Sequence, residues 1–83
     1  MALFFLSYDL RGERDYQKLY DELEKFHAVR ILESEWCFSR FNIDARGLRD
    51  YFKQFIDSND GLCVSEVADW ATYNAQDTPN DLK

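Results

Sequence analysis

The 83-residue chain is poor in residues that shape small secreted domains: it has two cysteines, one proline, three glycines and one histidine. Cys37 and Cys63 are too few for a disulfide framework and lack the spacing of zinc ligands, so we expect free thiols in a reducing, cytoplasmic setting. The chain also has no repeat, linker or low-complexity tract, and its length allows only one core. We therefore expect a single domain.

Long apolar runs are absent as well. No segment approaches the roughly 18–20 consecutive apolar residues that a membrane span needs. The apolar opening of the chain has no basic region before it, and polar residues begin at Ser7, which argues against a signal peptide. We therefore expect neither membrane contact nor export.

Basic residues are outnumbered, since ten Lys and Arg face sixteen Asp and Glu and give a net charge of −6. A protein that holds a phosphate backbone by itself usually has a basic field, so this balance disfavours nucleic acid as a partner. The acidity favours solubility, or docking on a protein partner. Arg30, Arg40, Arg46 and Arg49 either gather in a local basic patch or pair with carboxylates as ordinary surface charge.

Aromatic residues, by contrast, are abundant, with seven Phe, five Tyr and two Trp. A domain of this size buries only about 60–65% of the surface that its unfolded chain exposes, so its stability alone is thin. So many large rings indicate either a dense core or an interface. We expect a homodimer.

Hydrophobic periodicity divides the chain into six elements. Two segments repeat apolar residues at helical spacing, and each follows an aspartate, Asp15 or Asp44, that can cap the first turn. Four shorter apolar segments between turn residues read as strands. The predicted strands are 2–8, 28–32, 36–43 and 62–68, and the predicted helices are 16–27 and 45–56. Residues 70–83 lose this periodicity, and 78–81 reads as a loose end.

The element order predicts an α+β protein with the ferredoxin-like βαββαβ plan, in which two helices cover one face of a four-stranded antiparallel sheet. Residues 1–69 would form this domain, and 70–83 a C-terminal tail that is partly docked or lies at the dimer contact. In this plan the first strand separates the third from the fourth. Cys37 and Cys63 would then lie about 9.5 Å apart, too far for a disulfide.

Both faces of the predicted sheet look apolar, because alternate positions of the first strand are apolar on either side. A sheet face that stays in water usually carries polar residues, so something should cover the face that the helices leave bare. A symmetric second subunit is the simplest cover, with a contribution from the tail. We expect a sheet-to-sheet homodimer whose contact includes Phe4, Leu6, Trp36, Phe38, Trp70 and Tyr73.

Three segments carry a resemblance to a known group: LSYDL at 6–10, SEW at 34–36 and DSNDGLCVSEV at 57–67. With the element order and the small size, they make the chain similar to the small CRISPR adaptation protein that bridges the spacer integrase, to the VapD toxins, and most of all to the SinR-like proteins. The resemblance extends to about Trp70. It implies a ferredoxin-like homodimer packed through its sheet faces, often with C-terminal segments exchanged or added as edge strands.

The resemblance also implies two alternatives for Asp9, which follows the first predicted strand. In one, Asp9 and its symmetry mate hold Mg²⁺ or Mn²⁺ for weak endonuclease chemistry on RNA, with Tyr8, Arg11 and Arg14 in support. In the other, the protein is a non-catalytic interaction or regulatory module, and Asp9 starts a turn and pairs with Arg11 or Arg14. The acidic charge and the single strong ligand per subunit favour the module.

Two further alternatives come from the residues themselves. His27 ends the first predicted helix, and with no nucleophile in an obvious arrangement around it we expect packing at the helix end rather than general-base chemistry. A bare sheet rich in aromatics could also stack RNA bases. The segment 36–43 lacks the glycine and flanking basic residue of an RNA-recognition motif, which disfavours that function.

Overall fold

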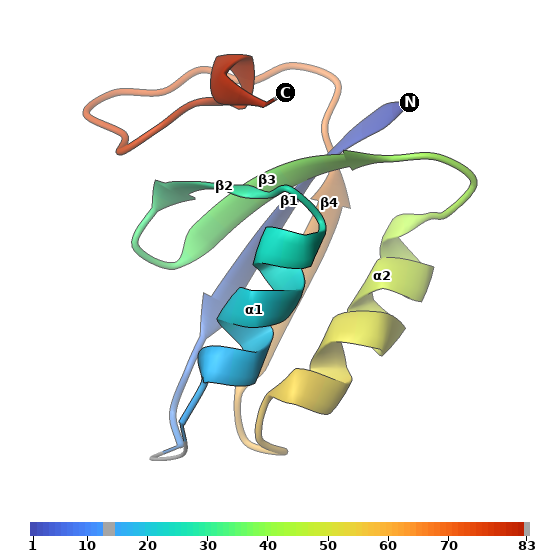
Figure 1. The fold of residues 1–83 in the computed structure, drawn as a ribbon, viewed down its shortest axis with the longest axis vertical. Coiled ribbons are helices and arrows are strands. Elements are labelled where there is room, and N and C mark those ends of the chain that lie inside the picture. The colour runs from blue at the N-terminus through green and yellow to red at the C-terminus, as the bar shows by residue number, and fades with distance from the viewer. Residues whose placement is uncertain (13–14, 83) are drawn as a thin grey trace.

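The structure is a computed structural model that describes residues 1–12 and 15–82. A four-stranded antiparallel sheet in the order β2-β3-β1-β4 carries two helices, an α+β arrangement compatible with the ferredoxin-like fold (Figure 1). No helix among the described residues combines the length and the apolar character that crossing a membrane requires. The strands are β1 (Ala2–Asp9), β2 (Val29–Leu32), β3 (Glu35–Arg40) and β4 (Gly61–Glu66); the helices are α1 (Gln17–Lys25) and α2 (Ala45–Phe52), with the short 3₁₀ helices η1 (Lys53–Phe55) and η2 (Pro79–Asp81).

Of the two predicted aspartate caps, Asp44 occupies the N-cap position of α2, whereas the N-cap position of α1 is Tyr16, the residue after Asp15. The Asp44 carboxylate accepts a hydrogen bond from the amide of Gly47 at 2.8 Å, as an N-cap residue does for α2. The Asp15 carboxylate accepts from the amide of Gln17 at 2.9 Å, where α1 begins. These side chains satisfy amides that have no partner within the helix.

The end of α1 depends on His27, which adopts a left-handed φ of 56°. Its amide donates to the carbonyl of Glu24 at 2.9 Å, and the amide of Ala28 donates to the carbonyl of Leu23 at 3.0 Å. This pair of bonds is a Schellman motif, in which the left-handed position usually holds glycine. His27 is exposed, so its position reflects the turn of the backbone rather than packing of the imidazole.

Every predicted element except the first strand is shorter than expected, and two of them show a local reason. The strand predicted over 36–43 ends at Arg40, because Asn42 adopts a left-handed φ of 57° and turns the chain out of the sheet. The helix predicted over 45–56 is α-helical only to Phe52 and then tightens into η1. Such a 3₁₀ last turn is common at helix ends.

The core lies between the sheet and the two helices. Phe4, Leu6 and Phe38 are completely buried there, and Trp36 is 7% exposed, so all four were wrongly expected at a dimer contact. The strands alternate, and the face that carries these residues is the one that the helices cover. The ring of Phe38 lies 6.0, 5.2 and 5.9 Å from the rings of Phe4, Phe26 and Phe52. Much of the aromatic excess thus builds a dense core.

The second face of the sheet has two halves. On β3 and β2, Cys37 and Ile31 are 0% and 1% exposed although they lie outside the helix-side core. The tail reaches this half, where the amide of Gln76 donates to the carbonyl of Ile31 at 2.9 Å and η2 packs on β2. On β1 and β4, Phe5 is only half-buried and Cys63 is exposed. The tail therefore covers one half of this face and leaves the other open.

The tail ends in an ordered turn. The Thr78 side chain accepts from the amide of Asn80, and the Asp81 side chain accepts from the amide of Thr78, which forms a capping box around η2. The expectation of a loose end at 78–81 was wrong. Threonine followed by proline is itself a signal for the start of a helix.

Candidate functional site

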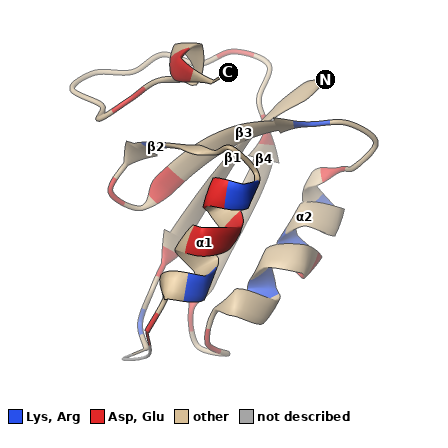
Figure 2. Cartoon of the chain, in the orientation of Figure 1, with Lys and Arg blue, Asp and Glu red and all other residues tan. Residues whose placement is uncertain are grey.

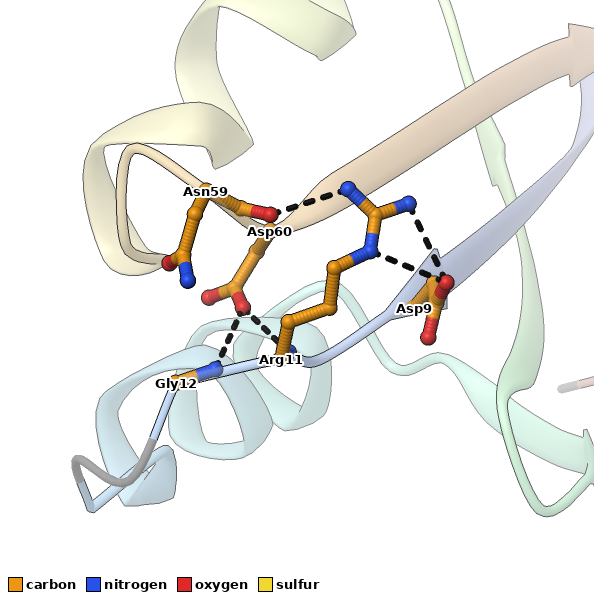
Figure 3. Close-up of polar contacts among 5 residues, drawn as sticks. All are labelled: Asp9, Arg11, Gly12, Asn59 and Asp60. Atoms are coloured by element: carbon orange, nitrogen blue, oxygen red, sulfur yellow. Dashed lines mark hydrogen bonds and ion pairs between the residues drawn. The ribbon is translucent and has the colours of Figure 1, made fainter.

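The predicted site lies at the end of β1, where the chain segment after Asp9 meets the turn before β4. Asp9 is the last residue of the strand, and its side chain is 71% exposed. Arg11 places both Nε and Nη2 at 3.1 Å from Asp9 Oδ2, while its Nη1 donates to the carbonyl of Asn59 at 2.9 Å (Figure 3). The arginine thus ties the end of β1 to the turn before β4.

Asp60 is the centre of hydrogen bonding in this region. Its Oδ1 accepts from the amides of Arg11 and Gly12 at 2.6 and 3.1 Å (Figure 3). Its Oδ2 accepts from the Tyr16 hydroxyl and the Asp57 amide, each at 2.7 Å. One carboxylate therefore holds together the start of the α1 connection and the turn before β4.

The titration of this region follows from these contacts. Burial alone would raise the pKa of the Asp60 carboxyl, but the hydrogen bonds from the Tyr16 hydroxyl and three backbone amides lower that pKa to about 2. Burial, together with the hydrogen bond to the Asp60 carboxylate, raises the pKa of Tyr16 to about 12. Asp60 is thus ionised and Tyr16 protonated at neutral pH, which suits a structural link.

Tyr8, expected to support Asp9, points to the opposite face of the sheet. Its hydroxyl accepts from Trp36 Nε1 at 3.1 Å and donates to the carbonyl of Glu33 at 3.2 Å. Burial raises the pKa of this phenol. The alternation of β1 separates the two neighbours, so the structure does not bring Tyr8 and Asp9 together.

Arg30 fills the space beside Tyr8. Its guanidinium carbon lies 5.4 Å from the ring centroid of Tyr20 and 5.5 Å from that of Trp36, within cation–π range. Its Nε also donates to the carbonyl of Glu33 at 3.0 Å. From the sequence, Arg30 was expected either in a basic patch or paired with a carboxylate. The stacking was missed because the two rings come from α1 and β3, which the fold brings together around Arg30.

The other arginines considered from the sequence are spread over the molecule. The guanidinium of Arg40 lies 3.9 Å from the ring centroid of Phe26, and Arg49 forms an ion pair with Asp50 at 2.8 Å. Figure 2 shows that α1 and α2 each carry residues of both charge signs. Exposed ion pairs of this kind contribute little to stability. These arginines do not form the patch that the sequence left open.

Shallow depressions flank the site. One of about 290 Å³ lies on the second face and is lined by Ser7, Asp9 and Cys63 among others. A larger one of about 530 Å³ lies between α2 and the start of β4 and is lined by residues of both charge signs, including Lys53 and Asp60. Tyr8 also lines the first depression beside Asp9, but Arg11 lines neither.

The fit of a divalent metal ion to Asp9 is poor. The carboxylate already has a guanidinium at 3.1 Å, and a second cation beside it would be repelled. Within residues 1–12 and 15–82, no three His, Cys, Asp or Glu side chains gather as metal ligands would. Arg14, the other predicted phosphate-binding residue, lies outside the described residues. The residues described at the end of β1 do not fit this ion.

No family model matches the chain. No solved structure matches it at a significant level either. The resemblance to the CRISPR adaptation, VapD and SinR-like group therefore rests on the segments 6–10, 34–36 and 57–67, the element order and the small size, and it stays a prediction.

Proposed function

We propose that the protein is a non-catalytic interaction module that works as a homodimer, as its resemblance to the SinR-like proteins implies. The observation that carries this proposal is the ion pair between Asp9 and Arg11, with Arg11 held in turn by the carbonyl of Asn59. A carboxylate used in this way ends a strand and fastens a neighbouring turn. A nuclease would need it free to bind a metal ion.

The open half of the second sheet face is the proposed surface for the dimer contact. Leu3 and Phe5 of β1 are half-buried there, and on β4 the exposed Ser65 lies opposite Phe5 and the exposed Cys63 lies opposite Ser7. Trp70 is half-buried and Tyr73 is 88% exposed, so both rings remain available for the contact that the sequence assigned to them. Burial of such rings is a strong source of binding energy.

The two cysteines support a reducing, cytoplasmic setting for this module. Both are free thiols, and β1 lies between the strands that carry them. Cys37 is buried, and burial raises its thiol pKa to about 11, which keeps it unreactive. The chain thus uses cysteine as a small apolar residue rather than as a cross-link.

The decisive experiment is hydrolysis of labelled single-stranded RNA and double-stranded DNA with Mg²⁺ or Mn²⁺. We expect no metal-dependent cleavage by the wild type, by Asp9→Ala, or by Arg11→Ala, which removes the guanidinium that neutralises Asp9. Asp69→Ala, at an exposed aspartate directly before the tail, is the matched control.

Cleavage that is lost in Asp9→Ala but kept in Asp69→Ala would overturn the proposal and make Asp9 a metal ligand. Cleavage that appears only in Arg11→Ala would mean that the ion pair suppresses an underlying activity, which would also contradict a purely structural role. Circular dichroism of each variant separates these outcomes from loss of the fold.

A further inference from the structure

The free edge of β4 is a second surface on which the chain can associate. β4 pairs with β1 on one side, and no strand of the described residues pairs with its other side. Val67 directly follows the strand, and its amide donates to the carbonyl of Leu3 at 2.8 Å. Backbone groups alternate in direction along a strand, so residues 61, 63 and 65, like Val67, turn their amides and carbonyls toward β1. Leu62, Val64 and Glu66 therefore turn their amides and carbonyls outward.

The opposite edge of the same sheet, formed by β2, is protected against pairing with another strand, whereas the edge formed by β4 is not. β2 has only four residues and an irregularity between Arg30 and Leu32, and the tail donates a backbone hydrogen bond to Ile31. Short strands, bulges and covering segments are the usual means of blocking an edge. β4 has six residues in unbroken register with β1, and it contains neither Lys nor Pro.

We propose that β4 of a second copy of this chain pairs antiparallel with this edge, with the two-fold axis at Val64. In this register Val64 faces Val64 of the partner subunit, Leu62 faces Glu66 of the partner subunit, and the outward amides and carbonyls of all three positions find partners. Cys63 faces Ser65 of the partner subunit on the second face. No two like charges stand opposite each other.

Neighbouring registers fit less well. With the axis at Cys63, Asp60 would face Glu66 of the partner subunit, and like charges opposite each other are destabilising. With the axis at Ser65, Leu62 would face a residue beyond the end of β4, so the contact loses part of its hydrogen bonding. The strand is thus self-complementary in one register, as a two-fold interface requires.

The edge contact is independent of the face contact proposed above. Its two-fold axis runs perpendicular to the sheet, whereas an axis that packs two sheet faces together runs parallel to them. Both contacts can therefore exist in one closed assembly of four chains with dihedral symmetry. Pairing at β4 would also place the open half-faces of two copies side by side.

The test is the sedimentation of Val64→Pro against Val64→Ala. Proline removes the outward amide of residue 64 without touching the ladder to β1, and alanine removes the same side-chain contacts but keeps the amide. We expect proline to weaken association by about tenfold or more and alanine by about threefold or less. Circular dichroism shows whether each variant is folded.

A second pair of variants keeps the test valid if Val64→Pro fails to fold. Cys63 and Ser65 are both exposed, so charges are tolerated there in the monomer. Cys63→Glu with Ser65→Glu places like charges across the proposed edge contact and should weaken it by about tenfold. Cys63→Lys with Ser65→Glu places opposite charges there and should restore the edge contact. Both double variants also charge the open half of the second face, so they are compared with each other rather than with the wild type.

The two contacts are separated by Phe5→Asp, which changes only the second face. With both contacts, the wild type sediments at about four times its 9.9 kDa chain mass, and either Phe5→Asp or Val64→Pro halves that mass. A wild type that stays at the chain mass at about 200 μM overturns the edge contact. The edge contact is also overturned if Phe5→Asp abolishes association while both sets of β4 variants associate like the wild type. That result would instead support the face contact.

Discussion

The two faces of the sheet are built from the same strands but are covered in different ways. On the helix side, Phe4 and Phe38 are fully buried by two helices whose own apolar stripes point at them. On the other side, Cys37 is buried by a tail with little regular structure, and Phe5 has no complete cover. One face is a core, and the other is half core and half surface.

This difference separates stability from recognition. Burial of large apolar side chains is the main favourable term in folding, so the helix side should carry most of the stability of the domain. The open half of the second face contributes less to folding and is free to contact a partner. The tail lies between these roles, because it completes a small second core and borders the proposed contact surface.

The largest expected difference between the faces is that between Phe38→Ala and Phe5→Ala. Loss of a fully buried phenylalanine costs about 3–5 kcal/mol of unfolding free energy, because the surrounding rings cannot close the cavity. The half-buried Phe5 leaves no enclosed cavity, so its loss should cost about 1 kcal/mol. Urea unfolding followed by circular dichroism measures both.

The comparison is made at low protein concentration, because dissociation of the proposed dimer would add to the free-energy cost of Phe5→Ala. Equal losses for the two variants would contradict the division between a core face and a surface face. A folded Phe38→Ala protein with wild-type stability would contradict the position of the core itself.

The alternation in β1 was readable from the sequence, but the choice of the helix-covered face was not. Phe4, Leu6 and Tyr8 form one apolar row, while Leu3 and Phe5 start another. Which row lies under the helices depends on how distant segments pack, and that is not encoded within the strand. For this reason the sequence-based prediction wrongly assigned Phe4 and Leu6 to a dimer contact.

The candidate site shows the same limit. The turn after β1 and the pairing of Asp9 with Arg11 were among the alternatives seen in the sequence. The role of Asp60 was missed, because DSNDG reads as an ordinary turn and the donors Gly12 and Tyr16 lie 48 and 44 residues away. The capped turn at Thr78, by contrast, carries a local signal that a closer reading would have found.

The second prediction concerns the tail. Deletion of residues 69–83 should expose Cys37, lower its thiol pKa from about 11 toward the usual 8.5 or so, and raise its rate of reaction with a disulfide reagent by about tenfold or more. The measurement is made in a Cys63→Ser background, which removes the exposed thiol, so that only Cys37 reacts with the reagent. Loss of Trp70 and Tyr73 should also weaken dimerisation, which sedimentation measures.

Full-length protein with Cys63→Ser is the matched control for this deletion. An unchanged Cys37 reaction rate would mean that some other segment covers this half of the face. An unchanged sedimentation profile would remove the tail aromatics from the dimer contact while leaving its covering role intact.

The smallest expected effect comes from changing His27 at the end of α1, one of the two helices that cover the helix side of the sheet. His27→Gly should raise the free energy of unfolding by about 0.5–1 kcal/mol, because glycine adopts the left-handed φ of 56° at the end of α1 without steric cost. His27→Ala removes the imidazole but keeps a β-carbon, so it should bring no gain. Cys37 should react with a disulfide reagent at the wild-type rate in both variants, since α1 lies on the other face of the sheet.

Two outcomes would contradict this prediction. An equal gain in unfolding free energy for His27→Ala and His27→Gly would assign the effect to loss of the imidazole. A changed reaction rate of Cys37 would show that the two faces of the sheet are coupled.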